Sequence, residues 1–151
     1  MDASNRVARL CAEGMMVEGQ DGGDKARRLF AQAWAESGDD VERCAAAHYL
    51  ARVQDSPTDA LRWNQEALER ANAVGDDRVR GFYPSLYLNL GKSYEDIGAW
   101  DDARRSYTLA SESVSDLTND GYGAMVRRGI AAGLRRTAAT PATPTTLAEA
   151  T

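Results

Sequence analysis

Residues 85–110 read SLYLNLGKSYEDIGAWDDARRSYTLA, and they carry the clearest helical pattern of the chain. Its first half carries aromatic, leucine and glycine residues at spacings of three, one and three: Tyr87, Leu90, Gly91 and Tyr94. Its second half carries two small residues and a ring at similar spacing: Ala103, Tyr107 and Ala110. These spacings place each set on one face of a helix, where small residues let two helix backbones approach and aromatic rings fill the remaining space. The stretch therefore predicts two packed helices joined by a turn at Gly98.

This helix pair resembles a tetratricopeptide repeat, whose 34-residue signature combines an aromatic residue, Leu-Gly and Tyr on one helix with Ala, an aromatic residue and Ala on the next. The resemblance is strongest over residues 84–117, and two weaker copies precede it. Their register follows from the small residue that opens the packing face of each second helix: Ala26, Ala60 and Ala103. The interval from Ala26 to Ala60 equals the repeat length of the family. The interval from Ala60 to Ala103 exceeds it, so the second connection is predicted to be longer.

The middle copy departs from the pattern. His48 stands where the third copy has Gly91, and Asn64 stands where it has the aromatic residue, although Ala67 matches Ala110. In the first copy Phe30 takes the aromatic position.

The resemblance implies an all-α fold, a right-handed α-α superhelix of three helix hairpins with a C-terminal capping helix. The repeat domain is expected over residues 1–137, with repeats at about 7–40, 41–75 and 84–117 and the cap at 121–136. Periodicity and capping residues predict seven helices, at about 4–19, 24–37, 41–54, 58–74, 83–97, 100–115 and 121–136. Residues 138–151, AATPATPTTLAEAT, are predicted to form a flexible tail, because they offer little apolar surface to bury.

Residues that favour helix starts punctuate these segments. Asp24 and Ser56 are predicted N-caps. The acidic pairs Asp39-Asp40, Asp76-Asp77 and Asp101-Asp102 each stand at an expected helix start, where carboxylates accept hydrogen bonds from free N–H groups, so capping explains them better than catalysis does.

Length and charge limit the classes of function. The 151 residues suffice for one domain with a core, and the net charge of -5 repels nucleic-acid phosphates. No apolar run approaches the roughly 18 residues of a membrane span, and charged residues interrupt the first twenty positions, which disfavours a secretory signal. We therefore expect no nucleic acid, no membrane and a cytoplasmic location. The basic residues are mostly Arg and Ala is abundant, which suggests a bacterial genome rich in G and C.

The sequence lacks the motifs of common enzyme and metal sites. Its single histidine, His48, is incompatible with a multi-histidine site, and we expect it to be structural. The segment GQDGGDKA at 19–26 lacks the ending of a phosphate loop. Cys11 and Cys44 are expected to be buried thiols. We therefore expect no enzyme, no catalytic residues, no metal and no cofactor.

The resemblance implies instead a scaffold that binds a protein or peptide in a concave groove lined by the first helix of each hairpin. Carrying over the register of the third copy gives the candidate groove residues Cys11, Met15, Tyr49, Arg52, Leu88, Asn89, Lys92 and Glu95. Asn89 matches an asparagine that some relatives with longer repeats use to hydrogen-bond a peptide backbone.

Other interpretations stay open at this level. The protein could be a self-associating homodimer, since three repeats leave end faces for pairing, or a peptide-sensing regulatory module. The basic set near the C-terminus is either a solvated face of the cap or a patch for an acidic partner; it comprises Arg127, Arg128, Arg135 and Arg136.

Overall fold

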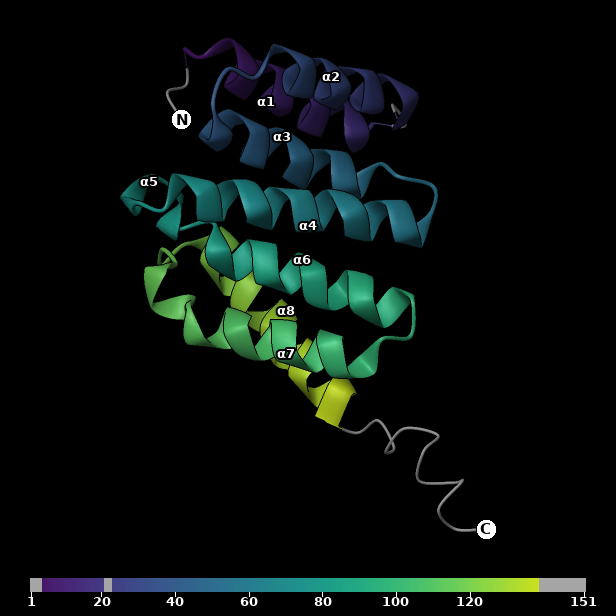
Figure 1. Cartoon of the computed structure of the whole chain (residues 1–151), viewed down its shortest axis with the longest axis vertical. Coiled ribbons are helices and arrows are strands. Elements are labelled where there is room, and N and C mark those ends of the chain that lie inside the picture. The colour runs from purple at the N-terminus through teal and green to yellow at the C-terminus, as the bar shows by residue number, and fades with distance from the viewer. Residues whose placement is uncertain (1–3, 21–22, 139–151) are drawn as a thin grey trace.

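The computed structural model of the chain describes residues 4–20 and 23–138, and over these residues the protein is helical with no strand. Six of the helices pack as consecutive pairs: α1 (Arg6–Glu18) with α2 (Gly23–Glu36), α3 (Asp40–Arg52) with α4 (Pro57–Val74), and α6 (Tyr83–Asp96) with α7 (Trp100–Glu112). Figure 1 shows the three pairs stacked in chain order, with α8 (Gly121–Ala138) crossing α6 and α7 at the C-terminal end. The expectation of an all-α fold is confirmed.

Two short elements occupy the connections after the second and third pairs. These are α5 (Asp77–Arg80) and the 3₁₀ turn η1 (Val114–Asp116). Neither was among the predicted helices, because such short segments carry no measurable helical period, although Asp76-Asp77 was assigned to a helix start. The seven longer helices agree with the predicted ranges to within three positions at each end.

Most of the predicted punctuation is confirmed. The Ser56 hydroxyl accepts a hydrogen bond from the Asp59 N–H at 3.3 Å, Asp39 and Asp76 cap α3 and α5, and Gly98 has a φ of +79° after α6. The prediction for Asp24 is wrong, since α2 already begins at Gly23 and places Asp24 in its first turn. Asp101 and Asp102 lie in the first turn of α7, where their charges favour the positive end of the helix dipole.

The C-terminal boundary of the repeat domain shifts by one position. Ala138, predicted to begin the tail, is the last residue of α8. The rest of the predicted tail, residues 139–151, lies outside the described residues.

A glycine facing an aromatic ring sets the spacing within two of the helix pairs. A Cβ at Gly14 would lie 2.4 Å from the ring of Phe30, and a Cβ at Gly91 would lie 2.5 Å from the ring of Tyr107. Each ring is fully buried, and each glycine precedes its ring by the same distance along the sequence. The third and first sequence copies therefore pack their helices in the same way.

The middle pair uses different residues at the same two positions. His48 and Asn64 have the same separation along the sequence as Gly14 and Phe30. His48 takes the place of the glycine, and Asn64 takes the place of the aromatic residue. Asn64 is 5% exposed and its Nδ2 donates a hydrogen bond to Ser93 Oγ at 2.8 Å, across to α6. A hydrogen bond between two helix pairs thus replaces an aromatic contact within one pair.

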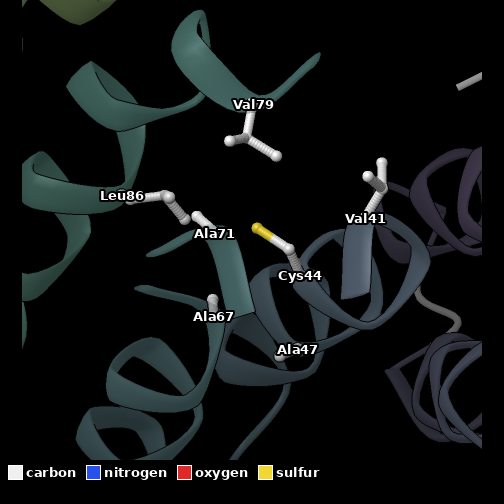
Figure 2. Close-up of a cluster of buried hydrophobic side chains, with 7 residues drawn as sticks. All are labelled: Val41, Cys44, Ala47, Ala67, Ala71, Val79 and Leu86. Carbon is white, nitrogen blue, oxygen red and sulfur yellow. The ribbon is translucent and has the colours of Figure 1, made fainter. Parts of the chain in front are cut away.

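Apolar packing between the pairs completes the core. Trp34 of α2 and Trp63 of α4 meet edge to face with ring centroids 5.1 Å apart, a geometry that aromatic pairs favour. Both rings pack against the cluster in Figure 2, in which Val79 of α5 points toward Cys44 of α3 and Leu86 of α6. Because Val79 is fully buried, α5 is anchored to the core despite its short length.

Candidate groove of the first helices

Two hollows of about 680 Å³ and about 390 Å³ lie along the side of the molecule formed by α1, α3, α6 and α8. These are the first helices of the three pairs together with the C-terminal helix. His48, Ser85 and Tyr122 line both hollows, so the two are neighbouring parts of one groove. We call them the large hollow and the small hollow.

The large hollow is lined by small side chains on two helices. Ala8 and Ala12 of α1 and Ala45 of α3 contribute to its lining. Tyr49, beside them on α3, stacks on Phe30 at 5.3 Å between ring centroids. The space exists because the facing positions hold alanines rather than longer side chains.

Both cysteines line the large hollow as buried thiols, as predicted. Burial raises the pKa of Cys11 to about 11 and that of Cys44 to about 12. Both are therefore protonated at neutral pH and are weak nucleophiles there.

The two short connections close one side of the large hollow. Gly81 and Phe82 after α5, and Leu117 and Thr118 after η1, contribute to its lining. A Cβ at Gly81 would lie 3.8 Å from the carbonyl oxygen of Asp116, so the connections lie side by side. We call this pair of connections the wall.

The small hollow is lined mainly by polar side chains. His48 Nδ1 and Asn89 Nδ2 lie 3.3 Å apart, and burial, with a smaller effect of the Arg52 charge, lowers the pKa of His48 to about 4. The imidazole is therefore neutral at pH 7, with Nδ1 accepting from the Asn89 amide and the proton on Nε2. Asn64 Oδ1, also in this lining, is buried and has no hydrogen-bond partner among the described residues.

Charged side chains at the small hollow are already paired. Arg52 pairs with Glu18 at 3.3 Å, and Lys92 pairs with Asp96 at 2.6 Å. A ligand carboxylate would have to compete with these partners for either cation.

Tyr122 of α8 stands where the two hollows meet. Its hydroxyl hydrogen-bonds the Ser85 hydroxyl of α6, while half of the residue remains exposed. Met125, one turn further along α8, lines the small hollow and is 55% exposed. Helix α8 thus contributes an aromatic ring and a flexible thioether to the groove.

The structure distributes the eight candidate groove residues over three places. Cys11, Met15 and Tyr49 line the large hollow. Arg52, Leu88, Asn89 and Lys92 line the small hollow. Glu95 lies in neither lining: it accepts two hydrogen bonds from Arg136 of α8, at 2.9 and 3.0 Å, and a third from the Tyr107 hydroxyl.

Four groove features were absent from the sequence interpretation: Tyr122, Met125, Asn64 and the wall. The exposed side chains of α8 could have been found by treating that helix as the first helix of a further repeat. Asn64 carried a visible signal, because it replaced an aromatic residue at a packing position. For the wall, the only signal was the long interval from Ala60 to Ala103, which predicted a longer connection but not its position.

The basic set of the last helix divides into two roles. Arg127 donates to the carbonyl oxygen of Thr118 at 3.2 Å, and Arg136 pairs with Glu95, so these two stabilise the fold. Arg128 and Arg135 are exposed on α8.

Two features are absent from the described part of the chain. It holds no group of three or more histidine, cysteine or acidic side chains arranged to bind a metal ion. None of its helices has the length and apolar character needed to span a bilayer.

Comparison with known proteins assigns no family. No family model matches the chain, no curated protein matches it significantly, and no solved structure does. The likeness to tetratricopeptide repeats therefore remains a prediction from the residues.

Proposed function

We propose that this protein is a binding scaffold whose groove takes up an extended segment or helix of a partner protein. The observation that carries the proposal is the gathering of large exposed apolar side chains at the groove. Met15 is 44% exposed, Tyr122 50% and Met125 55%, and all three line the hollows. Exposed apolar side chains beside a concave surface are typical of binding sites, and methionine adapts its shape to a partner.

The proposal includes the finer fold, a right-handed tetratricopeptide-like superhelix. The recurrence of the glycine-ring contact in the first and third pairs supports it. The separation along the sequence from Gly14 to His48 equals that from Phe30 to Asn64, and both match the repeat length of the family. In such an array the first helices line the inner face, and residues of the first helices line both hollows, which supports the proposal.

A binding role without catalysis is supported by the chemistry of the groove. The lowered pKa of His48 makes it a weak base, and both thiols are protonated at pH 7 and therefore weak nucleophiles. Buried reduced thiols also fit the cytoplasmic location that we propose.

The test begins with a phage-displayed library of random peptides, each about twelve positions long, selected on the full chain. Enriched peptides are then synthesised with a fluorophore and titrated by fluorescence anisotropy against the wild type and a Tyr49→Ala, Asn89→Ala double variant. We expect the double variant to bind at least about tenfold more weakly, because it removes one side chain from each hollow.

A matched double variant, Tyr94→Ala with Asn119→Ala, changes the same residue types outside both hollows. It should bind like the wild type, and thermal unfolding checks that both variants fold. Failure to enrich any peptide, or equal binding by both double variants, would contradict the groove as the binding site.

A further inference from the structure

The large hollow has the dimensions of a ligand site and a closed side. Its volume of about 680 Å³ falls within the roughly 300–1,000 Å³ of typical ligand pockets. That is more space than one side chain needs, and it accommodates a large side chain with its flanking main chain. The wall contributes the side of this hollow that faces α5 and η1.

Most residues that line this hollow are apolar, and its charged residues, Asp77, Arg78 and Asp116, are exposed. The alanines, the two protonated thiols and Tyr49 supply its α1 and α3 sides, and Phe82, Leu86 and Leu117 supply much of the opposite side. A charged group placed among them would lose its hydration without gaining an ion-pair partner. An aromatic or long aliphatic group would instead gain contacts with the lining.

At the wall, one negative charge has no ion-pair partner among the described residues. Arg78 pairs with Asp76 at 2.9 Å, and Asp77 pairs with Arg80. Asp116, which also lines the hollow, is exposed and has no ion-pair partner among the residues described. The opening therefore favours a basic neighbour of the inserted group over an acidic one.

We infer that the large hollow is a socket for one uncharged aromatic or long aliphatic side chain of the bound segment, preferably next to a lysine or arginine. The inference rests on the proposed groove function and adds the residue class that anchors the ligand. The alanines at positions 8, 12 and 45 act as specificity-determining residues, because larger side chains there would occupy the socket.

The test uses single-residue probes, the N-acetyl amides of Trp, Leu, Lys and Glu, titrated into ¹⁵N-labelled full-length protein. We expect the Trp and Leu amides to shift the backbone amide signals of Cys11, Ala45 and Gly81. The Lys and Glu amides should leave them in place. Equal shifts with the Lys or Glu amide, or no shift with either apolar amide, would overturn the socket.

Filling variants test the location of binding. Ala45→Phe and Ala12→Phe each place a ring in the socket, and Ala12 is exposed enough for its variant to fold normally. Both should weaken binding of N-acetyl-tryptophanamide at least about tenfold. Ala131→Phe, at an exposed site of α8 outside both hollows, is the matched control and should bind like the wild type. Undiminished binding by the Ala12→Phe variant would place the probe elsewhere and overturn the inference.

A charge arm compares N-acetyl-Trp-Lys-amide with N-acetyl-Trp-Glu-amide. The first should bind about twofold to threefold more tightly, as for an exposed ion pair, and Asp116→Asn should abolish the difference. Equal binding of the two dipeptides to the wild type would refute the preference for a basic neighbour.

Different experimental outcomes would contradict the socket and the proposed groove function. If library-selected peptides bind the wild type and the Ala12→Phe variant equally, the groove stands and the socket is wrong. If the amides bind as expected but the library yields no peptide, the socket stands and the proposed function is wrong.

Discussion

Single glycines determine how closely the helices of this protein pack. Tyr107 illustrates this most clearly, because the same edge of its fully buried ring, Cδ1, Cε1 and Cζ, lies against both Gly91 of α6 and Gly133 of α8. A Cβ at either glycine would lie 2.4–2.5 Å from ring atoms, well inside van der Waals contact. The Leu-Gly pair that marked this repeat in the sequence is therefore a steric requirement.

Gly91→Ala is expected to lower the free energy of unfolding by about 1–3 kcal/mol, the usual cost of overpacking. The better helix propensity of alanine, worth up to about 1 kcal/mol, offsets only part of it. Urea unfolding followed by circular dichroism measures the change. Gly121→Ala is the control, since nothing lies within 4 Å of its Cβ position, and it should leave stability equal or higher. A Gly91→Ala protein as stable as the control would contradict the packing.

His48 should make stability depend on pH in the range between its two pKa values. In the folded protein burial holds the pKa at about 4, whereas in the unfolded chain it returns to about 6.5. The unfolded state therefore binds the extra proton as pH falls from about 6.5 to about 4, and the folded state is destabilised over that range.

We expect the wild type to lose about 1–2 kcal/mol from this group between pH 7 and pH 5. His48→Asn has no titrating ring and should lose correspondingly less. Urea unfolding of both proteins at the two pH values measures this. Parallel losses in the two proteins would show that His48 is not held neutral by the fold.

At the scale of elements, one ion pair attaches the last helix to the third pair. Arg136 of α8 donates two hydrogen bonds to Glu95 of α6, and the side chain of Glu95 is only 8% exposed. These hydrogen bonds hold the pKa of Glu95 below its usual range, against the opposing effect of burial. Its carboxylate therefore stabilises the fold above the unfolded pKa of about 4.3, and that contribution disappears as pH falls through the lower folded value.

Glu95→Gln should lower the free energy of unfolding at pH 7 by about 1 kcal/mol, a modest value because Arg136 is half-exposed. The difference from wild type should shrink as pH is lowered below about 4. Glu112→Gln, at an exposed site on α7, is the matched control and should be neutral. Urea unfolding at pH 7 and pH 3.5 provides the measurement, and a cost that is the same at both values would argue against the ion pair.

The elements also show what the sequence could and could not predict. Long helices were predictable, since period and caps are local signals, and Ser56 and Gly98 behave as expected. The α5 helix was not predictable, because burial of Val79 against residues from three other helices holds it in place. Glu95 shares a helix with Asn89 and Lys92, but it lies outside both hollow linings and pairs with Arg136 of α8. The sequence could not predict this pairing, because Arg136 is far from Glu95 along the chain.

Across the molecule as a whole, the helix pairs differ in how many neighbouring helices pack against them. The main contacts of the α1–α2 pair with the rest of the described chain are with α3 alone. Helix α6, by contrast, packs against α4, α7 and α8. In a repeat array each unit is stabilised by its neighbours, so the pair with a single neighbour should open more often.

Hydrogen exchange should therefore be fastest in α1 and α2 among the long helices and slowest in α6. Mass spectrometry of peptic fragments after timed exposure to deuterated water resolves the order. Slower exchange in α1 than in α6 would contradict this view of the array.

The contact of the Tyr107 ring with two glycines has an energetic consequence. One ring belongs to the contact of α7 with α6 and also to its contact with α8. The Gly91→Ala substitution already displaces the ring, so adding Gly133→Ala should cost less than it does alone. The two losses of unfolding free energy should therefore not add. A double-mutant cycle should return a coupling energy of about 1 kcal/mol or more between residues on different helices. Helix α8 is then thermodynamically part of the third repeat, and unfolding one should carry the other with it.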